Sequence, residues 1–293
     1  MKILLTGGAG YVGSAVLRWL MKHGHDPVAY DDLSLGNRAA VPAERLIEGD
    51  ILNGARLREV LKEENIDAVM HFAALASVPQ SLKDPDAYWR INVEGTKRVL
   101  DAMRDCGVGK LIFSSTAATF AFDTEMPLRE TSPQVPQTPY GTTKLAGEWL
   151  IGEYCRAYGM GATIFRYFNA CGADPDGQYG EARGHEGHLI PLTLYVSLGR
   201  REKLLVFGSD YDTRDGTCVR DYVHNDDLAQ AHQLGVEQLT PGECKSYNLG
   251  SGTGTTVLEV HAACEKAVGK TIPLEKVDRR PGDPGTLVAS PER

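Results

Sequence analysis

Short runs of apolar residues alternate with amphipathic stretches along the first half of the chain. Each run is too short for a helix and is bounded by glycine or polar residues, which is typical of buried strands. The predicted strands are 3–6, 28–30, 46–48, 68–71, 110–114 and 162–167, and the predicted helices are 11–23, 54–64, 85–106 and 140–158. Such alternation favours an α/β protein with a doubly wound parallel sheet.

The pattern becomes less regular after Asn169. Residues 171–188 are rich in Gly, Asp and His without a clear period, so we expect a loop insertion there. The later expected elements are short: helices over 190–199, 226–238 and 256–268, and strands over 204–207, 220–223 and 246–249. The segment 278–293 is polar and turn-rich, and we expect no regular element in it.

The length of the chain indicates two lobes. A chain of 293 residues is near the upper limit for a single hydrophobic core. The regular alternation assigns residues 1–169 to the larger lobe, to which 221–250 return. Residues 170–220 and 251–293 then form a smaller C-terminal lobe.

Charge and cysteine content exclude several classes of protein. A net charge of −8 argues against nonspecific nucleic-acid binding. No apolar run approaches the roughly 18 residues of a membrane span. The six cysteines form no CxxC pair, and the N-terminus does not resemble a secretory signal. We therefore expect free thiols and a location in the cytoplasm. HxxH at 185–188 lacks a third ligand, so no metal site is expected.

A glycine-rich turn follows the first strand and opens the first helix. It contains Gly7, Gly10 and Gly13 within "TGGAGYVG". Glycines there allow a tight turn and let backbone N–H groups approach a pyrophosphate, which the positive end of the helix also favours. The context, strand then glycines then helix, predicts a Rossmann dinucleotide-binding lobe.

Acidic residues after the second and third predicted strands indicate which dinucleotide the lobe binds. Asp31 lies 18 residues past Gly13, near the spacing of the acid that binds an adenosine ribose. A carboxylate would repel a 2′-phosphate, which favours NAD over NADP. Asp32 competes for this role, but the strand-end position favours Asp31. Asp50 is placed to hydrogen-bond the adenine, and Ile51 to pack on it.

A tyrosine and a lysine four residues apart begin the helix predicted at 140–158. Tyr140 and Lys144 therefore share one helix face. A free tyrosine has a pKa near ~10, but a nearby ammonium and a cationic nicotinamide favour the phenolate. Ser114, Ser115 and Thr116 supply hydroxyl groups at the end of a strand, where such folds bind ligands. Together with the glycine turn, this pattern predicts proton transfer by Tyr140.

These segments resemble the extended short-chain dehydrogenase/reductase family of nucleotide-sugar enzymes. The resemblance rests on "TGGAGYVG", "HFAALASV", "FSSTAAT", "PYGTTKLAGE" and "RYFNACGAD". The segments at 189–229 and "YNLGSGTGTTVLEV" are most similar to those of its UDP-hexose 4-epimerases. The resemblance extends to about Asp283 and implies NAD-dependent interconversion of UDP-galactose and UDP-glucose.

The resemblance also implies a mechanism. Tyr140 would take the proton of the sugar C4 hydroxyl while the C4 hydride passes to NAD, which stays bound. The 4-keto sugar would then turn over in the pocket and receive the hydride on its other face. Lys144 would hold the nicotinamide ribose, and Thr116 would hydrogen-bond the C4 oxygen.

Two sets of contacts follow from the resemblance. The NAD contacts expected in addition to Tyr140 and Lys144 are Gly7, Gly10, Tyr11, Val12, Gly13, Asp31, Asn37, Asp50, Ile51, Phe72, Ala73, Ala74, Asn92, Ser114 and Tyr167. The UDP-sugar contacts expected are Thr116, Asn169, His188, Leu189, Phe207, Arg220, Arg280 and Asp283. Among them the two arginines would grip the pyrophosphate, because a guanidinium matches its geometry.

The chain departs from the family pattern in three places. A lysine often found after "HFA" is replaced by the run Leu75–Ala76–Ser77, which removes one phosphate contact. The family continues some tens of residues past "RRPGD", whereas this sequence stops at Arg293, so we expect a more open sugar pocket. Leu287 stands near the position that limits N-acetyl sugars, and its intermediate size leaves that preference open.

Alternative functions remain within and outside the family. Ala117 and Ala118 replace the Asp-Glu of the 4,6-dehydratases and argue against that activity. A 4-epimerase of UDP-N-acetylglucosamine, UDP-glucuronate or UDP-xylose, or a non-catalytic NAD-binding regulator, is the remaining alternative. Helices 85–106 and 140–158 resemble those that form a four-helix bundle in family dimers, so we expect a homodimer.

Overall fold

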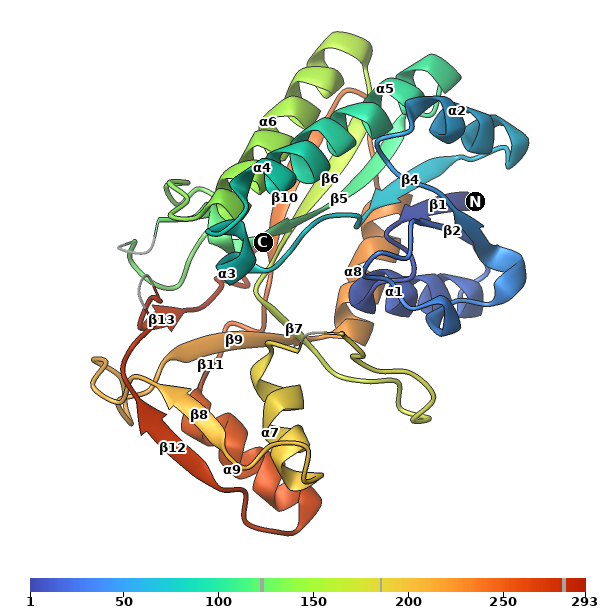
Figure 1. Cartoon of the computed structure of the whole chain (residues 1–293). Coiled ribbons are helices and arrows are strands. Elements are labelled where there is room, and N and C mark those ends of the chain that lie inside the picture. The colour runs from blue at the N-terminus through green and yellow to red at the C-terminus, as the bar shows by residue number, and fades with distance from the viewer. Residues whose placement is uncertain (122–123, 185, 281–282) are drawn as a thin grey trace.

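The larger lobe is built on a seven-stranded sheet. The computed structural model describes residues 1–121, 124–184, 186–280 and 283–293 (Figure 1). Up to the end of the sixth strand the elements are β1 (Lys2–Thr6), α1 (Tyr11–Lys22), β2 (Asp26–Asp31), η1 (Arg38–Ala40), η2 (Ala43–Arg45), β3 (Leu46–Glu48), α2 (Gly54–Glu63), β4 (Ala68–His71), α3 (Val78–Ser81), α4 (Pro85–Tyr88), η3 (Trp89–Gly95), α5 (Thr96–Cys106), β5 (Lys110–Thr116), η4 (Ala117–Thr119), α6 (Pro139–Tyr158) and β6 (Gly161–Tyr167).

The remaining elements complete this sheet and form the smaller lobe. They are β7 (Asn169–Cys171), α7 (Leu189–Ser197), β8 (Leu204–Phe207), β9 (Val219–His224), α8 (Asn225–Glu237), β10 (Cys244–Leu249), β11 (Gly254–Thr256), α9 (Val257–Val268), β12 (Leu274–Val277) and β13 (Thr286–Leu287). The seven-stranded sheet has the order β10-β6-β5-β4-β1-β2-β3, and every pair in it is parallel. The predicted doubly wound α/β class is confirmed.

Helices cover both faces of this sheet because its strands are apolar on both sides. Leu4 faces a core formed with α2, α5 and α6, whereas Ile3 and Leu5 face a core formed with α1 and α8. Figure 1 shows the two helical layers above and below the strands. None of the helices in the described parts of the chain is long and apolar enough to cross a membrane.

The predicted single helix at 85–106 consists of three segments in the structure. α4 leads into the π-helical turns of η3, and α5 follows. Within η3, Asn92 is buried, and its backbone carbonyl accepts a hydrogen bond from the Thr96 hydroxyl at 2.6 Å. A π-turn carries one more residue than an α-turn, which the helical hydrophobic period does not reveal.

α6 lies against the end of β5 at two glycines. A Cβ on Gly141 would lie 2.2 Å from the Ala118 carbonyl oxygen, and one on Gly147 would lie 2.9 Å from the Phe113 ring. Both distances are shorter than those that Cβ atoms make in proteins. A side chain at position 147 would displace the Phe113 ring, and one at position 141 would meet backbone and push the helix away. The first half of α6 is therefore held close to the carboxyl end of β5.

The smaller lobe contains a four-stranded sheet, a two-stranded sheet and its own core. β9 pairs with β7, β11 and β13, and β8 pairs with β12. α7 and α9 pack together with these strands around Val196, Val206 and Val260. Strands β11, β12 and β13 were not predicted, because runs this short show no period and β13 lies in the polar segment 278–293.

A buried carboxylate joins three segments of the smaller lobe. Asp221 on β9 is fully buried. It accepts hydrogen bonds from the backbone N–H groups of Ser251 and Gly252, at 2.6 and 3.0 Å, and of Ala289, at 3.1 Å. Leu128 exchanges backbone hydrogen bonds with Val288 and Ser290, so the last residues also contact the larger lobe.

We expect the α1 face of the core to contribute strongly to stability. Leu17 is fully buried in α1, whereas Met21 on the same helix is 37% exposed. Leu17→Ala should lower the free energy of unfolding by about 2–5 kcal/mol, because it removes packed methyl groups and leaves a cavity. Met21→Ala should change it by less than ~0.5 kcal/mol. Urea unfolding followed by circular dichroism measures both, and equal losses would contradict this assignment of the core.

Candidate functional site

The predicted cofactor residues gather at the carboxyl ends of the parallel strands. The first of them form the turn between β1 and α1, where Gly7 has φ of 70°. A Cβ on Gly7 would lie 2.5 Å from the Ala73 nitrogen, and one on Gly13 would lie 2.4 Å from the Gly7 carbonyl oxygen. Gly10 caps α1 without a side-chain hydrogen bond, which leaves the first N–H groups of the helix for a ligand. The turn therefore has the shape and polarity that a dinucleotide pyrophosphate requires.

The two residues after Gly10 have different surroundings. The hydroxyl of Tyr11 donates to the Gly172 carbonyl oxygen at 2.6 Å and so links the turn to the loop after β7. Val12 packs against the core between the sheet and α1. The backbone of these residues starts α1, so both positions are compatible with the predicted pyrophosphate contact.

Asp31, and not Asp32, faces the glycine turn. Its carboxylate accepts hydrogen bonds at 2.9 Å from the backbone N–H groups of Ala9 and Leu33. Burial raises the pKa of Asp31, and these two hydrogen bonds act in the opposite direction. Asp32 is exposed and accepts from Ser34. The structure thus agrees with the strand-end argument for choosing Asp31.

The residues predicted around the adenosine lie at the ends of β2 and β3. The Asn37 backbone N–H donates to the Ala9 carbonyl oxygen at 2.9 Å, beside the glycine turn. The exposed Asp50 is oriented by the Leu52 N–H at 2.8 Å. Ile51 is buried against Gly95, where any added Cβ would lie 2.5 Å from its side chain.

The loop after β4 is fixed by a buried asparagine. Phe72 and Ala73 both donate backbone hydrogen bonds to Thr6, and Ala74 follows them half-buried. The Asn92 side chain accepts from the Leu75 N–H at 2.8 Å and donates to the Leu75 carbonyl oxygen at 3.0 Å. Asn92 also donates to Thr143, so its amide nitrogen is fully used within the protein.

The predicted catalytic residues converge where α6 meets β5. Lys144 is 3% exposed, and its ammonium group lies 2.8 Å from the Ser114 carbonyl oxygen and 4.9 Å from the centre of the Phe113 ring. Tyr140 lies one turn earlier and packs edge-on against Tyr88 at 6.4 Å. Thr116 ends β5, and its hydroxyl oxygen accepts from the Ala118 N–H at 3.1 Å.

Burial dominates the electrostatics of this group. It raises the pKa of Tyr140 to about 12, while the Thr116 hydroxyl acts in the opposite direction. It also lowers the pKa of Lys144 to about 7, against the favourable charge of Glu148. The protein alone thus disfavours both charged forms. A pKa of Tyr140 below that of a free tyrosine therefore requires a further positive charge at the site, such as that of a nicotinamide.

Tyr167 lies on β6 beside Ser114. Its hydroxyl is 2.6 Å from His232 Nε2, and the other ring nitrogen of His232 lies 2.7 Å from the Leu228 carbonyl oxygen. Burial raises the pKa of Tyr167, so it remains a neutral phenol that donates to His232. This bond fixes the side chain of Tyr167, one of the predicted NAD contacts.

Four of the predicted substrate residues lie together in the smaller lobe. The Arg280 guanidinium stacks at 3.8 Å on the Phe207 ring, and Arg220 lies 3.2 Å from the Asp283 carboxylate. The neighbouring Arg279 is instead paired with Asp210. An aromatic ring, two guanidinium groups and a carboxylate are the groups needed for a base, a pyrophosphate and a ribose.

Three further predicted substrate residues lie at the starts of β7 and α7. Asn169 begins β7, and Leu189 begins α7 immediately after its N-cap residue His188. Of the two histidines in HxxH, His185 lies outside the described residues. His188 is paired with Glu181 at 2.6 Å, and Glu186 lies near both, a grouping that the sequence did not indicate.

Some residues of the site were missed in the sequence. Tyr88 and His71 pack around the catalytic pair, and His71 is held by the Thr6 and Thr96 hydroxyls at 2.6 and 3.0 Å. Burial, and then the charge of Lys144, lower the pKa of His71 to about 3. Glu148 had a signal that could have found it, since it repeats the four-residue spacing after Lys144.

Comparison with known proteins identifies the family. The model of the NAD dependent epimerase/dehydratase family matches residues 3–250. The UDP-glucose 4-epimerase of Corynebacterium glutamicum is 49% identical over 294 residues, covering 100% of this chain and 88% of that protein.

Solved structures agree with this match. The UDP-glucose 4-epimerase from Brucella ovis in complex with NAD has a TM-score of 0.95 and 44% identity, covering 99% of this chain and 90% of that one. The enzyme from Bifidobacterium longum in complex with NAD+ and UDP has a TM-score of 0.93 and 34% identity, with the same coverage. The resemblance carried by the glycine turn, the Tyr-Lys pair and the later motifs is confirmed, and the chain belongs to the NAD dependent epimerase/dehydratase family.

Proposed function

We propose that the chain interconverts UDP-galactose and UDP-glucose with NAD as a permanently bound cofactor. The convergence of Tyr140, Lys144 and Thr116 where α6 meets β5 carries this proposal. The 49% identity to a UDP-glucose 4-epimerase over the whole chain supports the substrate. Bound NAD supplies reversible hydride transfer at C4 of the sugar.

The protein residues would move and hold the proton. Tyr140 accepts the C4 hydroxyl proton and later returns it, and Thr116 hydrogen-bonds the same oxygen. Lys144 holds the nicotinamide ribose and, together with the cofactor's positive charge, favours the Tyr140 phenolate. The near-complete burial of Lys144 supports this role, because a charge acts more strongly where water is excluded.

The proposed cofactor site extends from the glycine turn to Tyr167. The shapes at Gly7 and Gly13 and the inward-facing Asp31 fit NAD without a 2′-phosphate. The proposed UDP site lies in the smaller lobe, with the uracil on Phe207, the pyrophosphate at Arg220 and Arg280, and the uridine ribose at Asp283. Asn169, His188 and Leu189 complete its wall.

We further propose that the two predicted lobes divide these tasks. Residues 1–169 and 221–250 would bind NAD, and 170–220 and 251–293 the UDP-sugar. Within 221–250, only the part after β9 belongs to the NAD-binding lobe, because β9 pairs with β7, β11 and β13 of the smaller lobe. The return of the chain to the large sheet is supported by the pairing of β10 with β6 and by the packing of α8 near α1. We place the protein in the cytoplasm, consistent with its six free thiols.

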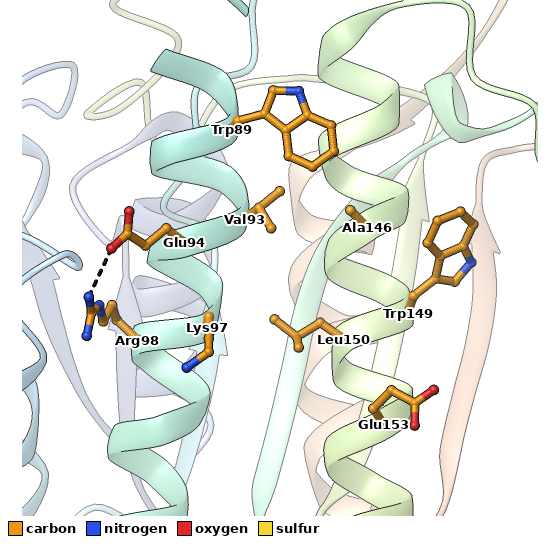
Figure 2. A pocket seen from close by; sticks show the side chains of 9 residues that line it. All are labelled: Trp89, Val93, Glu94, Lys97, Arg98, Ala146, Trp149, Leu150 and Glu153. Atoms are coloured by element: carbon orange, nitrogen blue, oxygen red, sulfur yellow. Dashed lines mark hydrogen bonds and ion pairs between the residues drawn. The ribbon is translucent and has the colours of Figure 1, made fainter. Parts of the chain in front are cut away.

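A homodimer through α6 and the 85–106 segment is the oligomer we propose. A hollow of about 640 Å³ lies between these helices and is lined by Trp89, Val93, Ala146, Trp149 and Leu150. Figure 2 shows these side chains on the two neighbouring helices. Trp89 is 45% exposed and Trp149 65% exposed. Large exposed indoles in an apolar patch are typical of protein interfaces. At its edge Glu94 and Arg98 pair with each other at 2.9 Å, which gives the apolar patch a polar rim.

Removal of one phenol tests the chemistry. Tyr140→Phe should lower turnover of UDP-galactose to UDP-glucose by about 10²–10⁴-fold, because it removes the phenol proposed to exchange the C4 proton. Tyr88→Phe is the matched control and should retain turnover within roughly tenfold, since its hydroxyl only donates to the Ser77 carbonyl oxygen. Product is measured by chromatography. Near-normal turnover in Tyr140→Phe would refute the mechanism.

Neighbouring arginines test the UDP site. Arg280→Ala should weaken UDP binding by roughly 10–100-fold, because it removes charge-assisted hydrogen bonds to the pyrophosphate. Arg279→Ala should weaken it by less than about threefold, since Arg279 is engaged by Asp210 and Tyr211. Isothermal titration calorimetry with UDP measures both. Equal effects would remove Arg280 from the proposed site.

A charged residue introduced into this hollow tests the proposed dimer interface. Trp149→Glu should convert a dimer to a monomer in light scattering, because a buried, unpaired carboxylate opposes association. Leu198→Glu is the control at an equally exposed position on the smaller lobe, where Leu198 is 64% exposed, and should leave the mass unchanged. A monomeric wild-type protein would overturn this arrangement.

A further inference from the structure

A buried carboxylate joins the helix that carries Tyr140 to the strand that carries Thr116. Glu148 lies on α6, one turn after Lys144, and its side chain is 5% exposed. One carboxylate oxygen accepts a short hydrogen bond from the hydroxyl of Ser115, which is the residue before Thr116 on β5. Neither Glu148 nor Ser115 is among the residues proposed to touch the cofactor or the sugar.

The same carboxylate also binds the next strand and the segment before α6. Arg166 on β6 donates to both of its oxygens, from Nε at 3.0 Å and from Nη2 at 2.7 Å. Gln134 donates to it at 3.1 Å, and Arg166 also donates to the Glu130 carbonyl oxygen at 3.1 Å. Glu148 is thus a junction of α6, β5, β6 and the segment that leads to Tyr140.

We infer that Glu148 is a positioning residue for the epimerisation: through Ser115 it fixes the distance between the Thr116 hydroxyl and the Tyr140 phenol. This inference rests on the proposed function. A bidentate, charge-assisted contact holds a side chain in one geometry more strictly than apolar packing does. A misplacement of catalytic groups by about 1 Å can lower a rate by roughly 10²-fold.

The glycine contacts of α6 do not by themselves fix this distance. Gly141 and Gly147 set how closely the helix approaches, but bare backbone permits sliding along the strand. Lys144 contacts the Ser114 carbonyl oxygen, which belongs to the main chain. The Ser115–Glu148 bond is the side-chain contact that fixes the register of α6 on β5 at the residue next to Thr116.

Glu148 has a second, electrostatic effect on the site. Its charge favours the protonated form of Lys144, one turn away. The other ionisable groups around Lys144 do not stabilise its protonated form. His71 on β4, Tyr140 and Tyr167 are held neutral, and Arg166 is paired with Glu148 itself. Loss of the Glu148 charge should therefore let Lys144 lose its proton at lower pH.

Ser115→Ala tests positioning without exposing a charge. It keeps the Glu148–Arg166 pair and should lower kcat by roughly tenfold, with KM for UDP-galactose within about twofold of the wild type. Ser81→Ala is the matched control, because Ser81 is equally buried but donates only to the Val78 carbonyl oxygen. It should retain wild-type kcat.

A substrate-free measurement separates positioning from general stability. In NAD-saturated protein labelled with ¹³C-tyrosine, the Tyr140 resonance is identified by its loss in Tyr140→Phe and followed against pH. Ser115→Ala should raise the pKa of Tyr140, because the Thr116 hydroxyl that favours the phenolate is displaced. Ser81→Ala should leave it unchanged. Equal kcat in the two serine variants, or an unmoved Tyr140 titration, would overturn the inference.

Glu148→Gln tests the charge itself. This variant keeps the shape of the side chain but removes its charge. Its kcat/KM should begin to fall at a lower alkaline pH than that of the wild type. In Ser115→Ala the alkaline fall of kcat/KM should occur at the same pH as in the wild type. Identical alkaline limbs would overturn the electrostatic part. If the wild-type protein does not convert UDP-galactose, the proposed function fails, while the Tyr140 titration in Ser115→Ala still decides the positioning role.

Discussion

The close contact of α6 with β5 is the constraint on which the active geometry depends. Gly141 and Gly147 leave no room for a Cβ, so the helix backbone approaches the Ala118 carbonyl and the Phe113 ring directly. Only at that separation can a side chain from α6 reach the last residues of β5. The glycine turn after β1 obeys the same rule, since Gly7 and Gly13 let backbone approach backbone. In both places the lack of a side chain on glycine allows the close approach that forms the site.

This closeness has an electrostatic consequence. A phenol and an ammonium removed from water both tend toward their neutral forms, as the pKa values of about 12 and about 7 for Tyr140 and Lys144 express. The proposed chemistry at Tyr140 needs the opposite charge states. Glu148, one turn after Lys144, favours the ammonium form of Lys144, and the positive charge of the nicotinamide would favour the Tyr140 phenolate in the proposed complex.

The sequence predicted the features that depend on local pattern. The parallel sheet followed from strand-helix alternation, and the glycine turn and the Tyr140–Lys144 spacing were visible as motifs. The π-turns at 89–95 were missed because one inserted residue hardly disturbs an apolar period. The partners of Glu148, at positions 115, 134 and 166, were missed because contacts between distant segments leave no spacing in a single sequence. Strand β13 was missed for the same reason, since Thr286 and Leu287 are a strand only because β9 lies beside them.

The buried carboxylate of Asp221 determines how the smaller lobe can fluctuate. Its hydrogen-bond donors come from residues 251–252 and 289. Loss of any of these donors leaves a buried carboxylate without a hydrogen bond that stabilises its charge. Local opening of the 250 loop and of the last residues is therefore a single event and not two. Amide hydrogens in these distant segments should exchange with solvent together, at one common rate.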